Sequence, residues 1–184
     1  PNATGSAGMS DRAEIRWAED GSTKAVADHV ARVVEGTDTP VIAVPGGSTP
    51  IAIFDELAAR GLDWAGATLM LGDDRMVAKD HAASNQAKLE AAFADSAANI
   101  ATLEEGADVP ALDLLWVGMG GDGHIASLFP EMTCEDQPGA KVIRTEPIPL
   151  PPEAPFPRLS MNFEALTTAP KETIIVIRGA DKKA

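Results

Sequence analysis

The sequence predicts a single α/β domain, in which helices flank a mostly parallel β-sheet. Two observations support this prediction. Short apolar segments rich in β-branched residues alternate along the chain with segments whose apolar residues recur at helical spacing. Three of these short segments run directly into loops rich in glycine or charge, and ligands bind in such loops beyond the carboxyl ends of parallel strands. The 184 residues are enough for one domain with a sizeable core.

The first third of the chain predicts a helix, a strand and a second helix. Apolar residues at helical spacing between residues 25 and 34 predict an amphipathic helix. Residues 39–44 form a short apolar run that ends at two glycines, which is the pattern of a buried parallel strand. In the helix predicted over residues 49–60, we expect Thr49 as the N-cap and Pro50 as the first helical residue.

The rest of the chain continues the alternation. Residues 67–71 predict a strand, residues 84–94 a helix, and residues 113–118 a third strand that leads into a glycine-rich turn. We expect a short helix to begin near Ile125, and residues 172–178 have the strong β propensity of a late strand. Strands separated by helices imply a parallel sheet with right-handed crossovers.

Two segments lie outside this pattern. Residues 145–157 contain six prolines, which excludes a helix or a central strand and predicts a stiff, extended surface connection. A proline-rich ligand for a partner domain is the alternative. Residues 1–8 lack the basic start and apolar stretch of a signal peptide and are interpreted as a leftover tag or a disordered segment. The domain is therefore expected to span residues 9–184.

Composition excludes several classes of partner. The net charge of −13 argues against nucleic acid and anionic membrane surfaces, because both select basic faces. The chain lacks a run of about 18 apolar residues, so no membrane span is predicted. A single cysteine, Cys134, excludes an intramolecular disulfide and a cysteine-rich zinc site, and it fits a cytoplasmic location. The three histidines have no metal-ligand spacing, so we expect no metal and no cofactor.

The first loop, residues 45–50 (Pro-Gly-Gly-Ser-Thr-Pro), is a candidate anion cradle. Gly46 and Gly47 let the backbone approach a ligand, and Ser48 and Thr49 add hydroxyl donors. The helix start that follows offers unpaired N–H groups. The spacing of a nucleotide-binding P-loop is absent. A tight turn with an ordinary helix cap is an equal alternative.

The second loop, residues 72–77 (Gly-Asp-Asp-Arg-Met-Val), is also compatible with two interpretations. Asp73, Asp74 and Arg75 directly follow a predicted strand at its carboxyl end. Two carboxylates and a guanidinium are costly to hold together unless they pair or meet a ligand. A ligand site and a surface turn with a salt bridge fit the residues equally well.

The third loop, residues 118–124 (Gly-Met-Gly-Gly-Asp-Gly-His), is the strongest functional signal. Its glycines let the backbone approach a substrate closely, and Asp122 and His124 lie at its tip. Because an imidazole titrates near neutral pH, His124 is a candidate general base. His29 is expected to be structural and His81 a solvated loop residue. The glycine spacing also matches a dinucleotide-binding fingerprint, but Asp122 and His124 occupy places where a pyrophosphate needs small neutral residues.

Two cations complete the set of candidates. Arg158 lies at the entry to a β-like stretch, and Lys182 follows the last predicted strand. In an acidic chain, cations at such positions are natural phosphate contacts. From the residues alone, simple surface solubility is the favoured interpretation of both.

Taken together, the chain resembles the glucosamine-6-phosphate isomerase/6-phosphogluconolactonase family from about residue 15 to its end. The resemblance implies a Rossmann-like α/β core. The matching segments, in order along the chain, are residues 45–50, 73–77, 84–85, 118–130, 158–161 and 179–182.

Within this family, the residues resemble the lactonase branch more than the deaminase branch. Residues 126–130 read Ala-Ser-Leu-Phe-Pro, where deaminases typically have Ala-Phe-Asn-Glu-Pro with an acidic residue used in ring opening. Arg75 matches the lactonase motif Asp-Glu-Arg, although Asp74 replaces its glutamate. A deaminase and a noncatalytic sugar-phosphate sensor remain the alternatives. Relatives continue beyond residue 184, so we expect that a C-terminal part of the domain is missing.

The resemblance implies hydrolysis of 6-phospho-D-glucono-1,5-lactone to 6-phosphogluconate, in the oxidative pentose phosphate pathway, by a monomer or small homo-oligomer. His124 would activate water, and Arg75 would stabilise the oxyanion together with backbone amides of residues 120–123. Asp73, in preference to Asp122, would orient the imidazole or the arginine. Arg158 and Lys182 would hold the phosphate. The other expected substrate contacts are Gly46, Gly47, Ser48, Thr49, Asn85, Gly120 and Asp122.

Overall fold

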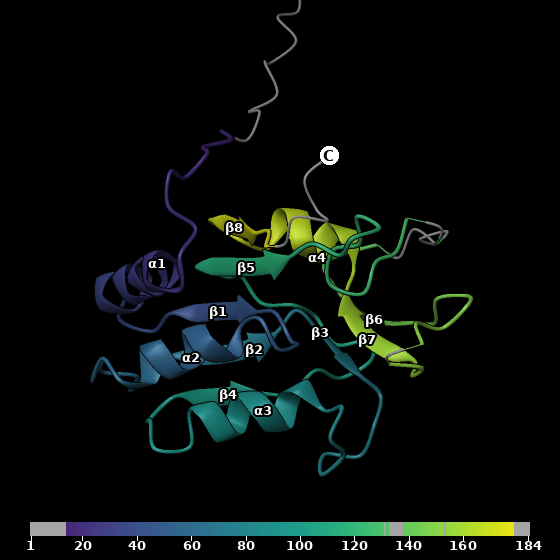
Figure 1. Ribbon diagram of the computed structural model, residues 1–184, viewed down its shortest axis with the longest axis horizontal. Coiled ribbons are helices and arrows are strands. Elements are labelled where there is room, and N and C mark those ends of the chain that lie inside the picture. The colour runs from purple at the N-terminus through teal and green to yellow at the C-terminus, as the bar shows by residue number, and fades with distance from the viewer. Residues whose placement is uncertain (1–13, 131, 133–137, 153, 179–184) are drawn as a thin grey trace, which may run out of the picture.

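The computed structural model describes residues 14–130, 132, 138–152 and 154–178, and its centre is a five-stranded parallel sheet (Figure 1). The strand order is β4-β2-β1-β5-β8. The strands are β1 (Val41–Val44), β2 (Thr68–Leu71), β4 (Asn99–Ala101), β5 (Leu114–Gly118) and β8 (Thr173–Val176). The predicted α/β fold with a mostly parallel sheet is confirmed. Strands β1, β2, β5 and β8 lie in the predicted runs with slightly shorter ends, whereas β4 was not predicted.

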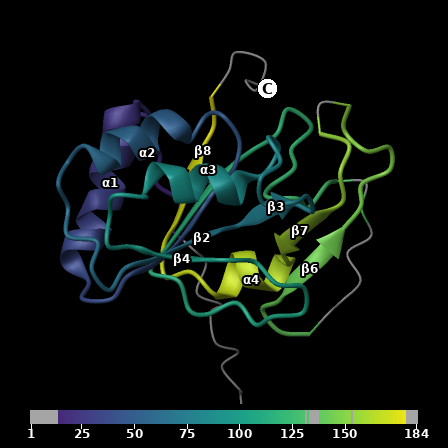
Figure 2. The same cartoon turned by 90° about the horizontal axis from the view of Figure 1, so that it is seen from below.

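Helices α1 (Thr23–Gly36), α2 (Ile51–Ala58) and α3 (Asn85–Ala92) pack side by side (Figures 1 and 2). Right-handed crossovers from β1 to β2 and from β2 to β4 place α2 and α3 on the same face of the sheet. The short helix α4 (Phe163–Thr168) lies beside β7. The helices predicted over residues 25–34, 49–60 and 84–94 are therefore confirmed, and they pack against the sheet that positions the loops.

Aromatic side chains fill the space between these helices and the sheet. Trp116 on β5 is buried, and its ring meets that of Phe54 on α2 edge-on, with centroids 5.7 Å apart. Phe93 at the end of α3 packs in the same way against Phe54 and against Trp64, with centroids 5.8 and 5.0 Å apart. Edge-to-face geometry is the favoured arrangement of aromatic pairs, so this cluster fixes α2 and α3 against the sheet.

A second, antiparallel sheet was not predicted. It has the order β3-β7-β6, with β3 (Asp73–Arg75), β7 (Arg158–Met161) and β6 (Val142–Thr145). Strand β3 consists only of polar residues, so it carries no apolar alternation that would predict a strand. Its register places Arg75 opposite Arg158, and Asp73 opposite Ser160. The second sheet therefore joins two distant candidate segments of the sequence.

Two local predictions were wrong. Helix α2 begins at Ile51 with Pro50 at its N-cap, so Thr49 is not the cap residue that was expected. Pro50 nevertheless has right-handed helical angles, which is what the prediction of a first helical residue requires. No helix begins at Ile125, which instead forms isolated bridges with Met119 and Leu128. The left-handed φ of 52° at Ala126 interrupts any right-handed helix there.

The proline-rich connection between β6 and β7 is only partly a surface segment. Pro147 and Ala154 are buried, and the backbone oxygen of Ala154 accepts a hydrogen bond from Arg158 at 3.1 Å. The peptide bond between Ile148 and Pro149 is cis. Part of this connection therefore covers a candidate site residue, a role that the proline content did not indicate.

Candidate active site

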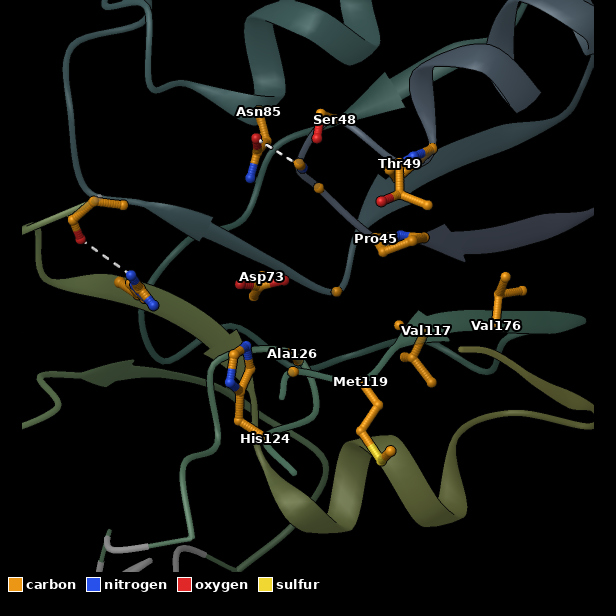
Figure 3. Close-up of a pocket in the computed structure, with 18 of the residues that line it drawn as sticks. Pro45, Ser48, Thr49, Asp73, Asn85, Val117, Met119, His124, Ala126 and Val176 are labelled. Atoms are coloured by element: carbon orange, nitrogen blue, oxygen red, sulfur yellow. Dashed lines mark hydrogen bonds between the residues drawn. The ribbon is translucent and has the colours of Figure 1, made fainter. Parts of the chain in front are cut away.

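A cavity of about 500 Å³ lies at the carboxyl ends of β1, β2 and β5, where all three loops meet (Figure 3). Figure 3 shows Asn85, Ser48 and Thr49 on one side of it and His124 and Met119 on the other, with Asp73 between them. Parallel α/β sheets place ligand sites at this edge. A cavity therefore lies at the edge of the sheet where the sequence predicted the site.

The first loop is held against α3 by Asn85. The Asn85 side-chain oxygen accepts a hydrogen bond from the Gly47 backbone N–H at 3.1 Å. A Cβ atom on Gly46 would lie only 2.0 Å from the Asn85 side-chain nitrogen, so position 46 requires glycine. Gly47 has a φ of +96°, which disfavours other residues there. Ser48 and Thr49 are exposed in the cavity wall, where they can reach a ligand.

Asp74 anchors the second loop to the start of α3. Its carboxylate accepts hydrogen bonds from the backbone N–H groups of Asn85 and Gln86, both at 2.9 Å, and of Arg75 at 2.8 Å. A negative charge at a helix N-terminus is favourable because the N–H groups there have no helical partner. The shorter aspartate in place of the usual glutamate thus holds the second loop to α3, and it is not among the residues that line the cavity.

Arg75 presents its guanidinium to the cavity from a fixed position. Nη1 donates hydrogen bonds to the Ala83 backbone oxygen and to the Asn85 side-chain oxygen, both at 3.1 Å. Asn85, which is buried, therefore connects Arg75, 10 residues before it, to Gly47, 38 residues before it. Planar guanidinium donors held in this way suit carboxylate, phosphate or oxyanion groups.

Asp73 lies in the cavity wall but does not contact the imidazole. Its Oδ2 accepts a hydrogen bond from the Ser127 hydroxyl at 2.6 Å. Desolvation raises the pKa of Asp73 above its ordinary value, and the Ser127 hydrogen bond and the charge of Arg75 oppose that rise. Asp73 therefore does not orient the imidazole, one of its two predicted roles, because its carboxylate is bonded to Ser127. Its alternative role beside Arg75, whose charge acts on it, stays a prediction.

Asp122 is the actual partner of His124. Its Oδ1 lies 2.6 Å from Nδ1 of His124 and accepts the His124 backbone N–H at 3.2 Å. Desolvation works to raise the pKa of Asp122, but these hydrogen bonds outweigh it and lower the pKa. Asp122 does not line the cavity, so its expected role as a substrate contact is replaced by one behind the histidine.

The glycines of the third loop make room for this pair. A Cβ atom on Gly120 would lie 2.2 Å from the imidazole of His124. The Gly120 N–H donates to the His124 backbone oxygen at 2.9 Å, and the Gly123 N–H donates to the Gly120 oxygen at 3.1 Å. The backbone amides of Gly120 and Gly123 are therefore occupied within the turn, so these two of the amides of residues 120–123 are not available for the expected oxyanion contact.

Two arginines described in the structure add positive charge to the cavity besides Arg75. Arg158 is only 6% exposed, and its guanidinium carbon lies 5.2 Å from the centre of the Phe129 ring. Arg178, which the sequence reasoning missed, also lines the cavity and donates to the Gly21 oxygen at 3.0 Å. Its place at the carboxyl end of a predicted strand was the available signal.

Most of the predicted site residues meet in one place. The predicted residues that line the cavity are Gly46, Gly47, Ser48, Thr49, Asp73, Arg75, Asn85, Gly120, His124 and Arg158. Phe129, Ser127 and Arg178 join the site without having been predicted. Lys182 and Cys134 lie outside the described residues.

The remaining histidines lie elsewhere. His29 is on α1, with Nε2 3.1 Å from Glu172, and His81 is exposed in a loop beside Phe156. Within the described ranges, no group of three or more His, Cys, Asp or Glu side chains is arranged to hold a metal ion. In the same ranges, no helix has the length and apolar character that a membrane span requires.

Comparison with known proteins places this geometry in a family. The family model of glucosamine-6-phosphate isomerases/6-phosphogluconolactonase matches residues 18–105 and 86–184. The 6-phosphogluconolactonase of Rhizobium meliloti is 33% identical over 184 residues, covering 87% of this chain and 79% of the relative. That of Neisseria meningitidis serogroup A is 31% identical over 185 residues, covering 87% and 78%.

A solved structure agrees with this placement. The crystal structure of 6-phosphogluconolactonase from Thermotoga maritima superposes with a TM-score of 0.74, covering 90% of this chain and 84% of that one. Its sequence identity of 24% makes this a likeness of fold. With a family model that spans nearly the whole described chain and relatives above 30% identity, the chain belongs to the glucosamine-6-phosphate isomerase/6-phosphogluconolactonase family.

Proposed function

We propose that this protein hydrolyses 6-phospho-D-glucono-1,5-lactone to 6-phosphogluconate, with His124 as the general base. The observation that carries the proposal is the pair formed by His124 and Asp122 at the wall of a cavity that also contains three arginines, Arg75, Arg158 and Arg178. A base beside concentrated positive charge suits hydrolysis of an anionic ester. The relatives named 6-phosphogluconolactonase support the same substrate.

In the proposed mechanism, the contact between His124 and Asp122 determines which imidazole nitrogen serves as the base. An ionised carboxylate can only accept a hydrogen bond, so the Asp122 contact places the proton of neutral His124 on Nδ1. Nε2 is then the basic nitrogen. In the proposed reaction, Nε2 removes a proton from water while the water oxygen bonds to the lactone carbonyl carbon. The protonated imidazole next donates that proton to the ring oxygen as the bond between carbonyl carbon and ring oxygen breaks.

Arg75 is proposed to stabilise the charge that develops on the carbonyl oxygen. Its contacts with Ala83 and Asn85 use Nη1 and restrain the guanidinium, which lines the cavity. Preset donors aimed at developing charge are a major source of rate enhancement. Since the amides of Gly120 and Gly123 are occupied, the guanidinium carries most of this role.

The phosphate and sugar contacts are proposed at the other groups of the cavity. Arg158, with Lys182 outside the described residues, would hold the phosphate, and the buried position of Arg158 strengthens its charge-assisted hydrogen bonds. Asn85 and the first loop would contact the sugar. Binding energy from the phosphate, remote from the carbonyl carbon, would position the reacting carbon against His124.

A specific residue disfavours the deaminase alternative. Phe129 stands where the deaminase branch has its glutamate, and its ring centroid lies 4.5 Å from that of His124. A phenyl ring can neither donate nor accept the proton that ring opening requires. A noncatalytic sugar-phosphate sensor would keep the binding groups but show no turnover, so activity measurements separate it.

The deciding experiment measures hydrolysis of freshly prepared lactone, corrected for its spontaneous hydrolysis, beside His124→Ala. We expect the variant to lose about 10²- to 10⁴-fold in kcat while binding of 6-phosphogluconate is largely kept. A variant that retains most of the corrected rate would disprove the role of His124. Release of ammonia from glucosamine 6-phosphate by the wild-type protein would support the deaminase instead.

A further inference from the structure

Ser127 contacts the active site from a fully buried position. Its side chain is 0% exposed, and its hydroxyl donates to Oδ2 of Asp73 at 2.6 Å. The two residues are 54 positions apart in the sequence, so the contact exists only because the third loop meets β3. A buried hydroxyl with a single short bond to a cavity carboxylate has a defined geometry. None of the steps proposed above uses it.

The surroundings of Ser127 hold it in this orientation. Its backbone N–H donates to the hydroxyl of Ser160 at 3.2 Å, and the Ser160 hydroxyl donates to the Met161 backbone oxygen at 3.0 Å. Ser160 is also 0% exposed and lies directly opposite Asp73 in the pairing of β3 with β7. The left-handed backbone of Ala126 turns the chain so that Ala126 lines the cavity and Ser127 points inward.

The contact determines how Asp73 meets the cavity. In the described part of the chain, Ser127 is the one side chain that donates a hydrogen bond to the Asp73 carboxylate. With Oδ2 engaged, Oδ1 is left for a group in the cavity, whose wall Asp73 forms. Without Ser127, the carboxylate would be free to turn toward the positive charges of Arg75 and Arg158, which act on it electrostatically.

We propose that Ser127 is a positioning residue that holds the Asp73 carboxylate so that its free oxygen accepts a hydrogen bond from a sugar hydroxyl. The inference rests on the proposed function, since it takes a sugar-phosphate lactone as the ligand. A carboxylate offers only acceptors, and the ring of a sugar lactone offers hydroxyl donors that match it. The pair of Ser127 and Asp73 therefore selects a hydroxylated ring over an unsubstituted lactone of the same size.

Electrostatics support this arrangement independently of its geometry. Burial raises the pKa of Asp73, whereas the Ser127 hydrogen bond stabilises the ionised form and opposes the rise. Ser127 thus helps to keep the carboxyl an acceptor. The hydroxyl it is proposed to bind is present in both the substrate and the transition state. Loss of such a contact raises KM and leaves kcat nearly unchanged.

The test is a double-mutant cycle with Ser127→Ala, Asp73→Asn and the combined variant. We expect Ser127→Ala to raise KM about tenfold, the scale of a lost hydrogen bond to a charged group. Asp73→Asn should raise KM at least as much. The combined variant should be no worse than Asp73→Asn alone, because residues that act as one unit are not additive.

Two further variants serve as a control and as a graded test of the Ser127 hydroxyl. Ser96→Ala removes a hydroxyl that donates to the Phe93 oxygen at 2.8 Å, away from the cavity, and should leave KM unchanged. Ser127→Cys has nearly the same volume but a weaker donor, and should give a KM between those of wild type and Ser127→Ala. If Ser127→Ala does not fold, Ser127→Cys replaces it in the double-mutant cycle with Asp73→Asn.

The outcomes separate this inference from the proposed function. Effects of Ser127→Ala and Asp73→Asn that multiply, or a fall in kcat at constant KM, would overturn the positioning role. If the wild-type protein does not hydrolyse the lactone, the same cycle is read from the Kd of 6-phosphogluconate by calorimetry. A non-additive loss of affinity there would support the pair even though the proposed reaction had failed. Full affinity in Ser127→Ala would reject it.

Discussion

The two sides of the cavity are built in different ways. One side, here the binding wall, consists of Gly47, Arg75 and Asn85, joined by hydrogen bonds between segments 10 to 38 residues apart. The other side, here the reacting wall, consists of Gly120, Asp122 and His124, whose hydrogen bonds to one another span at most four residues. Side-chain exposure is 54% for Asp122 and 32% for His124, whereas Asn85 is 3% exposed.

This difference separates two requirements of the site, a stable surface for binding and an accessible group for reaction. The binding wall depends on buried, long-range contacts, so its geometry is as stable as the packing of α3 against β3. The reacting wall is a local turn that presents the proposed base, His124, to solvent, so its geometry depends on a few residues in sequence. Damage to the binding wall should therefore affect both stability and KM, whereas damage to the reacting wall should affect mainly kcat.

The largest effect is expected from Asp122→Asn on the reacting wall. An asparagine can donate its amide N–H to Nδ1, which moves the imidazole proton to Nε2 and removes the base. We expect kcat to fall about 10²- to 10⁴-fold with KM nearly unchanged. Steady-state kinetics with background correction provides the measurement, and Asp95→Asn, in an exposed turn after α3, is the control. A normal kcat in Asp122→Asn would mean that the pair has no role in turnover.

A pair of glycine substitutions compares the two walls directly. Gly120→Ala places a Cβ atom 2.2 Å from the imidazole, so the ring must move and kcat should fall with little loss of stability. Gly46→Ala places one 2.0 Å from the buried Asn85 side chain. It should raise KM and lower the free energy of unfolding by about 1–3 kcal/mol, the usual cost of overpacking.

Steady-state kinetics gives kcat and KM of both glycine variants, and chemical denaturation gives their free energies of unfolding. Gly36→Ala at the end of α1 is the matched control, because an added Cβ atom there meets nothing within 4 Å. If both cavity variants lost stability equally, the contrast between a buried binding wall and an exposed reacting wall would not hold.

The smallest effect concerns the pH dependence of stability. The folded state lowers the pKa of Asp122, so its contribution to stability is present above the ordinary value and is lost as pH falls through the folded pKa. It raises the pKa of Asp73, so ionisation of that group costs stability as pH rises through the folded pKa. Asp73→Asn should therefore gain melting temperature relative to wild type between about pH 3 and pH 7, and Asp122→Asn should lose it.

Melting curves at several pH values test both signs in one experiment. Each difference should vanish at the acid end, where both carboxyls are protonated in the folded and unfolded states. A loss of stability in Asp73→Asn at neutral pH would show that the Ser127 hydrogen bond outweighs the desolvation of the carboxylate.

Local patterns were sufficient for much of the fold and for the reacting wall. The apolar runs that became β1, β2, β5 and β8 could be recognised because burial of a parallel strand selects apolar, β-branched residues within the strand itself. The glycine-rich turn and His124 were visible for a similar reason. A tight turn that holds His124 at the cavity requires glycines within the turn itself, and these are visible in the sequence.

Contacts between distant segments were not predictable in the same way. Strand β3 carries no apolar alternation, so its pairing with β7 appeared only in the folded chain, and with it the meeting of Asp73 and Ser127. The choice of Asp122 over Asp73 as the partner of His124 also needed coordinates, because both carboxylates follow strands that end at the same edge.

The sequence by itself predicted an α/β domain of one family and singled out His124 as the candidate base. The tertiary structure decided which carboxylate supports that histidine, that Asp74 caps α3, and that Arg178 lines the cavity. The physical reason is the range of the interactions. Periodicity and turn chemistry act over a few residues and leave a local pattern, whereas the partner of a polar side chain is selected by register and packing between segments that no local pattern relates.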